Sequence, residues 1–114
     1  MALANDIPDL RLWHILNHLE TSYWWDVDCN GGGQAHEFYM PDGLFAVGDN
    51  QFLGRQNIRA FYTWRRRRGF MTLRHMIYNF RVVSSAEYRA SHAAVLGIIR
   101  HRAAHPSVAR IPRT

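Results

Sequence analysis

The sequence predicts an α+β fold in which helices lie on one face of an antiparallel sheet. Three observations lead to this prediction: a helical pattern over residues 9–28, a second one over residues 55–68, and two long strand-like segments at residues 71–83 and 87–102. A chain of 114 residues with 47% hydrophobic residues is long enough for one core and too short for two. We therefore expect residues 1–114 to form a single domain.

The first helix is expected over residues 9–28 because apolar side chains recur there at spacings of three and four. They are Leu12, Leu16, Leu19, Tyr23 and Val27. The helix should end at the segment CNGGG, residues 29–33. Consecutive glycines cost roughly 1 kcal/mol each inside a helix and favour a turn.

Several shorter elements are expected next. A short helix (residues 34–39) leads into a turn with the sequence MPDG, and the segments GLFAVGD and QFLG then indicate a small hairpin around Asp49 and Asn50. A second helix follows over residues 55–68, with Ile58, Phe61 and Tyr62 on its apolar side. The two long strands after it should be joined by a loop at residues 84–86.

The positive charge of the chain has a structural explanation. All 14 cationic residues are arginine, and the formal net charge is +5. The run at residues 65–68 closes the second predicted helix, where cations complement the negative end of the helix dipole. A charge cluster alone specifies no partner, so we favour this structural role over a nucleic-acid site.

The sequence also bears on location. Its longest apolar runs fall short of the roughly 20 residues that a membrane-spanning helix needs, and the first residues, MALANDIPDL, lack the features of a secretory signal. Cys29 is the single cysteine, which fits a reducing compartment and is expected to be an incidental residue. We therefore expect a cytoplasmic protein with no membrane association.

Polar residues interrupt the first long strand on what should be its inner face. Strict alternation places Met71, Leu73, His75, Ile77 and Asn79 on one face, and Arg74, Met76, Tyr78, Phe80 and Val82 on the other. Two facts single out the face with His75 as the inner one: both faces are largely apolar, and an arginine can reach solvent at the rim of an interface. His75 and Asn79 would then lie about 13 Å apart along the strand.

A buried histidine needs a hydrogen-bond partner. Asp26 and Asp28, at the end of the first helix, are the candidate acids, and helical projection does not decide between them. A carboxylate on one ring nitrogen would leave the other nitrogen as a general base, because the ordinary pKa of imidazole lies near neutral pH. The alternative is a core histidine bonded to a backbone carbonyl.

Other residues suggest binding rather than proton transfer. Tyr23, Trp24, Trp25, Phe38 and Tyr39 are aromatic residues that could line an apolar pocket or belong to the ordinary core. His14 and His18 have a spacing of four that suits a metal, but no acid is placed to join them. We predict no metal site and no cofactor.

The segments YWWDVD, EFYMPDGLF, GRQNIRAFYTWRRRRG and TLRHMIYNFRV, in this order and spacing, resemble the nuclear transport factor 2-like superfamily. The resemblance extends over residues 8–100 and is strongest to the SnoaL-like and scytalone dehydratase-like branch. It implies a cone-shaped, cystatin-like roll in which a curved antiparallel sheet wraps around a long N-terminal helix. It also implies a pocket at the open end and a homodimer formed through the sheet.

The same resemblance implies roles for particular residues. His75 would abstract a proton and Asp28 would orient it, with Asp26 as the fallback. A small hydrophobic carbonyl or ring substrate would be bound by Asn79, Tyr23, Trp24, Phe38 and Tyr39.

Three interpretations of function stay open. The first is a cofactor-independent lyase or isomerase, of the dehydratase, ketosteroid isomerase or polyketide cyclase type, which requires a roomy pocket and a short contact between His75 and an aspartate. The second is a noncatalytic ligand-binding or dimerisation module of the same fold. The third is a nucleic-acid binder that uses the arginine run, whose affinity would fall steeply with salt.

Overall fold

The structure is a computed structural model, which describes residues 9–69, 72–86 and 89–101. The elements in chain order are α1 (Leu10–Cys29), η2 (Ala35–Phe38), β1 (Leu44–Val47), β2 (Asn50–Leu53), α2 (Arg55–Arg67), β3 (Thr72–Ala86) and β4 (Arg89–His101). The strands form two antiparallel two-stranded sheets, β1–β2 and β3–β4. The predicted α+β class is thus confirmed, with a long N-terminal helix and antiparallel sheets. The single domain over residues 1–114 stays a prediction.

Most predicted elements lie close to their predicted bounds, with one difference at the long hairpin. The expected loop at residues 84–86 belongs to β3, where the hydroxyl groups of Ser84 and Ser91 lie 2.7 Å apart across the hairpin. The prediction of a loop there is wrong, because serine hydroxyls can pair across neighbouring strands as well as in turns. Met71, residues 87–88 and residue 102, which the sequence assigned to strands, lie outside the described residues.

Local capping fixes both ends of α1. At its start, the side chain of Asp9 accepts hydrogen bonds from the backbone N–H groups of Arg11 and Leu12. After its last residue, Gly31 and Gly32 adopt positive φ angles of 62° and 74°. A Cβ atom on Gly32 would overlap the ring of Tyr62. The glycine turn therefore allows the chain to reverse close against α2.

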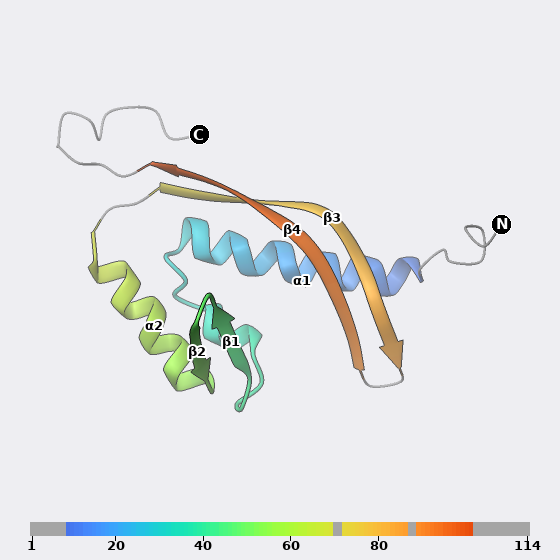
Figure 1. Cartoon of the computed structure of the whole chain (residues 1–114), viewed down its shortest axis with the longest axis horizontal. Coiled ribbons are helices and arrows are strands. Elements are labelled where there is room, and N and C mark those ends of the chain that lie inside the picture. The colour runs from blue at the N-terminus through green and yellow to red at the C-terminus, as the bar shows by residue number, and fades with distance from the viewer. Residues whose placement is uncertain (1–8, 70–71, 87–88, 102–114) are drawn as a thin grey trace.

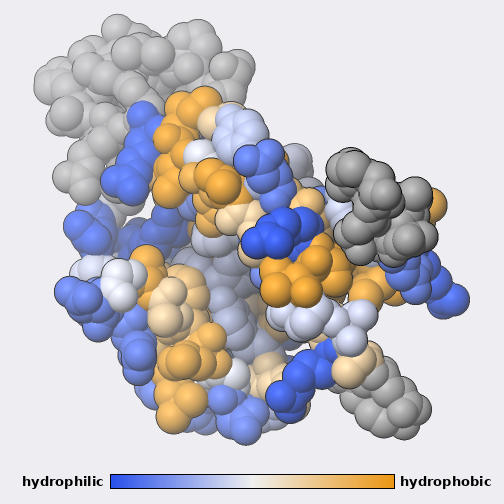
Figure 2. All heavy atoms as spheres, turned by 45° about the vertical axis from the view of Figure 1, so that its right-hand side comes forward, coloured by the Kyte–Doolittle hydropathy of each residue, from blue (hydrophilic) through white to orange (hydrophobic). Residues whose placement is uncertain are grey.

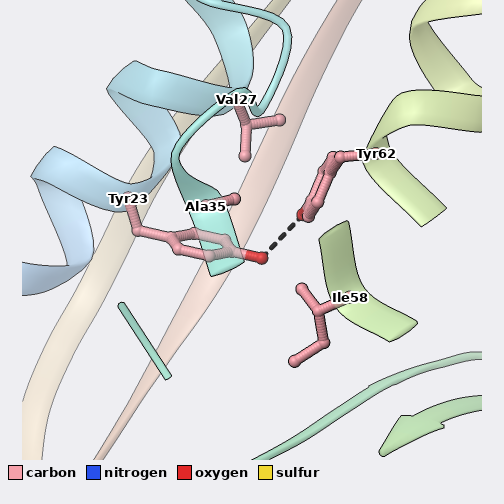
Figure 3. Close-up of a cluster of buried hydrophobic side chains, with 5 residues drawn as sticks. All are labelled: Tyr23, Val27, Ala35, Ile58 and Tyr62. Carbon is pink, nitrogen blue, oxygen red and sulfur yellow. Dashed lines mark hydrogen bonds between the residues drawn. The ribbon is translucent and has the colours of Figure 1, made fainter. Parts of the chain in front are cut away.

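The core lies between α1, η2 and α2 (Figure 3). Its buried side chains are Tyr23, Val27, Ala35, Ile58 and Tyr62. Six partly buried aromatic residues pack around them: Trp24, Phe38, Tyr39, Phe45, Phe52 and Phe61. The β1–β2 hairpin contributes Phe45 and Phe52 and so closes one side of this core. Aromatic side chains therefore make up most of the packed interior.

The β3–β4 hairpin is long and curved and crosses over α1 (Figure 1). Its pairing changes register between Tyr78 and Arg81, where Asn79 takes a φ of 53°. This is a β-bulge, with one extra residue on β3. A second register shift follows between Val82 and Ser84.

The first bulge overturns the predicted assignment of faces beyond residue 78. Phe80 was expected on the face opposite to His75, yet its ring meets Trp13 of α1 at 5.6 Å between centroids, on the side where His75 also meets α1. Asn79, which was expected to point inward, is exposed. The physical reason is that an extra residue in a strand exchanges the two faces for the residues after it, here as far as the second register shift after Val82.

The surface carries several apolar patches. Figure 2 shows orange, hydrophobic side chains gathered in separate groups, with the surface hollowed between them. Within the described residues, none of the helices has the length and apolar character needed to cross a membrane.

Candidate functional site

The side chain of Asp28 binds His75 through two hydrogen bonds. Asp28 lies in the last turn of α1, and His75 lies near the start of β3. One carboxylate oxygen, Oδ1, lies 2.6 Å from Nδ1 of the imidazole, and the other, Oδ2, accepts the backbone N–H of His75 at 2.6 Å. The two side chains are only 6% (His75) and 7% (Asp28) exposed. This contact fixes both the ring and the strand that carries it.

The imidazole of His75 is also fixed from one face. The ring of Trp24 stacks on it, with 4.1 Å between centroids and 22° between planes. Since a carboxylate only accepts, Nδ1–H donates a hydrogen bond to Asp28, and the neutral ring then carries a free lone pair on Nε2. Among the described residues, the buried side-chain polar atom without a partner is Nδ1 of His36, so Nε2 of His75 is not sealed in the interior.

Asp26, the fallback partner for His75, has a different role. It is 8% exposed and accepts hydrogen bonds from the side chain of Asn30 (2.8 Å) and from the backbone N–H of Gln34 (3.1 Å). Two residues along a helix turn the side chain by about 200°. Asp26 therefore holds the glycine turn, while Asp28 faces β3. The geometry thus shows that Asp28, and not Asp26, contacts His75, a choice that the residues alone left open.

His75 and Asp28 line a pocket of about 400 Å³, here called the dyad pocket. The other lining residues come from α1 and β3: Asn17, Thr21, Trp24, Trp25, Cys29, Arg74 and Ile77. The pocket thus combines an imidazole with hydroxyl, amide and guanidinium groups and two indole rings. Such a set can bind an uncharged organic molecule and hydrogen-bond its oxygen atoms.

A second pocket of about 240 Å³, here called the aromatic pocket, lies between α1, η2 and β1. It is lined by Leu19, Glu20, Tyr23, Trp24, Phe38, Tyr39 and Phe45. The four aromatic residues predicted to bind substrate all line this pocket, and Trp24 alone lines both pockets. Asn79, the fifth predicted binding residue, lines neither of the two. The structure therefore separates one expected site into two neighbouring pockets.

A second histidine–carboxylate pair lies beside the aromatic pocket and was not predicted. Nε2 of His92, on β4, lies 2.7 Å from Oε2 of Glu20, on α1. The indole N–H of Trp24 donates to the other oxygen of Glu20 at 2.9 Å. The ring of His92 also stacks on Phe80. The two members of the pair are 72 residues apart, and no local motif marks either one.

Three tyrosine hydroxyl groups form a chain behind the aromatic pocket. Tyr39 donates to Tyr23 at 2.9 Å, and the hydroxyl groups of Tyr23 and Tyr62 lie 2.6 Å apart (Figure 3). Burial raises the pKa of all three phenols, that of Tyr62 to about 12. These hydroxyl groups therefore stay protonated at neutral pH and act as hydrogen-bonding groups.

The remaining polar candidates have mainly local contacts. Within residues 9–69, 72–86 and 89–101, no three His, Cys, Asp or Glu side chains are grouped so as to hold a metal ion. His14 and His18 stack on each other at 6.4 Å. In the arginine run, Arg66 donates to the carbonyl oxygen of Gly31 at 3.0 Å, and the guanidinium of Arg68 lies over Trp64. These contacts give the run a structural role at the end of α2.

Comparison with known proteins adds information about the fold. No protein-family model and no curated protein matches the chain. A solved structure from Catenulispora acidiphila, at 2.5 Å resolution, has a similar fold, with a TM-score of 0.69 and 16% sequence identity. The match covers 82% of this chain and 68% of that chain. At this identity, the likeness is one of fold alone.

Proposed function

We propose that the protein is a small-molecule pocket protein of the nuclear transport factor 2-like superfamily, with the cone-shaped, cystatin-like roll of the SnoaL-like and scytalone dehydratase-like branch. In this proposal it is a cofactor-independent lyase or isomerase that acts on a hydrophobic carbonyl or ring compound. The observation that carries the proposal is the pair of hydrogen bonds that Asp28 accepts from His75 beside the dyad pocket. A general base needs such a partner on one ring nitrogen and free access at the other.

In the proposed reaction, one residue, His75, both takes a proton from the substrate and gives it back. Nε2 of His75 takes a proton from the carbon next to the substrate carbonyl, and the electron pair of that C–H bond moves onto the carbonyl oxygen. The imidazolium formed is stabilised by Asp28 and by the stacked face of Trp24. The electron pair then returns from the oxygen as the C=O bond re-forms. In a β,γ-unsaturated ketone the carbon–carbon double bond shifts into conjugation and the same Nε2 gives its proton to the γ carbon, which isomerises the substrate. In a β-hydroxy ketone the α,β double bond forms, the C–O bond breaks, and Nε2 protonates the departing hydroxyl group, which leaves as water.

The dyad pocket also holds groups that suit the other end of the reaction. Arg74 starts from the other face of β3, and its long side chain also lines the pocket. One guanidinium N–H donates to the carbonyl oxygen of Leu73 at 2.6 Å, and the remaining N–H groups of this cation can stabilise the oxyanion. Asn17 and Thr21 line it from α1 and offer further polar atoms for orienting the substrate oxygen. We therefore place the carbonyl oxygen of the substrate toward Arg74 and its acidic carbon toward His75.

The proposal includes a homodimer formed through the β3–β4 sheet. Three large apolar side chains on this hairpin, Tyr78, Val95 and Ile99, are 48%, 56% and 54% exposed. Tyr78 pairs directly with Val95, and Ile99 pairs with Arg74, so the three apolar side chains share one face of the hairpin, which by strand alternation is the face opposite to His75. A contiguous exposed apolar face of this kind favours a contact with another protein surface. Sedimentation equilibrium of the wild type and of Val95→Glu would test it, and a monomeric wild type would contradict it.

Proton abstraction can be tested before the physiological substrate is identified. The purified protein is incubated in D₂O with a panel of cyclic and aryl ketones, and deuterium incorporation next to the carbonyl is followed by proton NMR. We expect exchange above the buffer rate for some members of the panel, loss of that exchange in His75→Gln, and its retention in His14→Gln, where the changed histidine is exposed.

A noncatalytic ligand-binding module of the same fold is the second candidate. The observation in its favour is that Tyr23, Phe38 and Tyr39 line the aromatic pocket and not the dyad pocket. Ketones that bind, as seen by shifts of indole N–H resonances, but exchange no deuterium would support this module and contradict proton transfer. An absence of both binding and exchange across the panel would contradict both candidates.

A further inference from the structure

The aromatic pocket has the composition of a cage. Five of its seven lining residues are aromatic. The rings of Trp24, Phe38 and Tyr39 stand at 89°, 90° and 78° to the ring of Tyr23, with centroids 4.9–5.7 Å away. These edge-to-face contacts hold the rings in nearly perpendicular planes, and all four rings line the pocket. The π face of an aromatic ring is its negative pole.

Glu20 is the one charged residue among the seven that line this pocket. Its oxygens are fixed by one N–H from Trp24 and by the ring of His92, and its side chain is still 22% exposed. A carboxylate has about four lone-pair positions, so these two partners leave room for a further donor. Burial raises the pKa of Tyr39, and the charge of Glu20 raises it further, so this phenol stays neutral in the same pocket as the carboxylate.

These features select a ligand by charge. An anion would be repelled by both the carboxylate and the ring faces. A neutral apolar ligand would displace water from the carboxylate without replacing its hydrogen bonds, which carries a desolvation penalty. An organic cation is attracted by the carboxylate and by the ring faces together.

We propose that the aromatic pocket is a second binding site, which takes a small organic cation of the alkylammonium type, with Glu20 as its counter-charge and the rings of Tyr23, Trp24 and Tyr39 as its walls. This site goes beyond the proton transfer assigned to His75 and uses neither His75 nor Asp28. His92 acts as a positioning residue, because it orients the carboxylate of Glu20 from β4.

The test compares two ligands of the same shape that differ in charge. Choline and its uncharged carbon analogue, 3,3-dimethylbutan-1-ol, are titrated separately into the ¹⁵N-labelled protein, and the indole N–H resonance of Trp24 is followed. We expect choline to shift this resonance and to bind roughly tenfold more tightly than the uncharged alcohol. Equal affinities, or no binding of choline, would overturn the proposal without the need for any variant.

Two variants test whether Glu20 is the source of the preference for choline. Glu20→Gln keeps the size of the side chain and removes its charge, and we expect it to abolish the preference for choline. Glu37→Gln makes the same change at an exposed position on η2 and should keep the preference. A preference that survives in Glu20→Gln would overturn the assignment of the counter-charge.

A third variant separates this site from the dyad pocket. Asp28→Asn should leave the affinity for choline within about twofold of the wild type, because Asp28 does not line the aromatic pocket. Choline binding without ketone exchange in the wild type would support the cation site while contradicting proton transfer. Ketone exchange without choline binding would support proton transfer and contradict the cation site.

Discussion

The two oxygens of the Asp28 carboxylate hold both the backbone N–H and the imidazole Nδ1 of His75, each at 2.6 Å. One side chain at the end of α1 thus sets the position of a strand and the protonation pattern of the ring on it. Because an acceptor on Nδ1 leaves the lone pair on Nε2, this contact decides which nitrogen is available as a base.

Replacing Asp28 by Asn should reverse the tautomer of His75. The amide can still accept the backbone N–H through its oxygen, but its NH₂ group then faces Nδ1, which must become an acceptor, and the ring proton moves to Nε2. We expect ¹⁵N NMR of the imidazole to show protonated Nδ1 in the wild type and protonated Nε2 in Asp28→Asn, with ketone exchange lost. An unchanged tautomer in Asp28→Asn would contradict this prediction.

Asp26→Asn is the matched control, and it should behave differently. It changes a carboxylate two residues away that holds the glycine turn through Asn30 and Gln34. We expect a loss of roughly 1–3 kcal/mol in the free energy of unfolding, measured with urea, because a buried hydrogen-bonded charge is removed. The tautomer of His75 should remain that of the wild type. A reversed tautomer in this variant would show that the two aspartates are coupled.

Gly32→Ala should destabilise the protein more than Gly48→Ala. Both glycines have positive φ angles, 74° and 58°, so each substitution carries a backbone cost of about 1 kcal/mol. A Cβ on Gly32 would also overlap Tyr62, whereas a Cβ on Gly48 meets nothing within 4 Å. We expect an additional loss of roughly 1–3 kcal/mol for Gly32→Ala in urea unfolding. Equal losses would show that the turn does not pack against Tyr62 as described.

The buried tyrosine chain should make the protein less stable in strong alkali. An unfolded tyrosine ionises near its ordinary pKa of 10.0, whereas the folded pKa of Tyr62 is raised to about 12 and those of Tyr23 and Tyr39 are also raised. The folded state therefore binds more protons above pH 10, so the free energy of unfolding falls as the pH rises above that value. Urea unfolding at pH 8 to 11 measures this slope.

The tyrosine prediction has an internal control. Tyr62→Phe removes one of the three raised pKa values, and the slope of stability above pH 10 should become shallower. Tyr78, which is 48% exposed and lies outside the hydroxyl chain, provides the comparison as Tyr78→Phe. A larger change in slope for Tyr78→Phe than for Tyr62→Phe would contradict the assignment.

Asn79 should matter for the backbone of β3 and not for ligand binding. Its φ of 53° lies in the left-handed region, which Gly tolerates and β-branched residues do not. We expect Asn79→Gly to be close to neutral and Asn79→Val to lose roughly 1–2 kcal/mol in the free energy of unfolding. Both variants should keep the ligand affinities of the wild type under folded conditions. Weaker ligand binding by Asn79→Gly would restore the role that the sequence suggested for this residue.

The sequence predicted those elements that depend on local patterns. Periodicity and glycine positions located α1 and α2, and the face of β3 up to Ile77 followed the alternation of side chains. The proximity of His75 to an aspartate was also predicted, and the family resemblance favoured Asp28 over Asp26. The residues alone left that choice open, because it depends on the three-dimensional direction of the helix. The hydrogen bonds between Asp28 and His75 show which aspartate faces β3, and a helical projection does not contain the position of that strand.

The bulge and its consequences could not be predicted from the sequence. An asparagine tolerates the left-handed conformation but does not require it, so the register shift at Asn79 has no unambiguous local signal. The pairing of Val82 with His92 follows that shift, and the contact between His92 and Glu20 depends on this pairing. The separation into two pockets likewise depends on the placement of Trp24, which packing and not periodicity decides.

The end of α1 joins parts of the chain that are far apart in sequence. Asp26 accepts hydrogen bonds from the turn that follows the helix, and Asp28, two residues later, accepts one from His75 of β3, which lies 47 residues further along the chain. Opening this helical turn would release both attachments together, so its amide protons should exchange with solvent only when much of the fold opens. The N-terminal turns of α1, where Leu10 and Ile15 are 74% and 51% exposed, can open at a smaller free-energy cost. The two ends of one helix thus differ in how cooperatively they open.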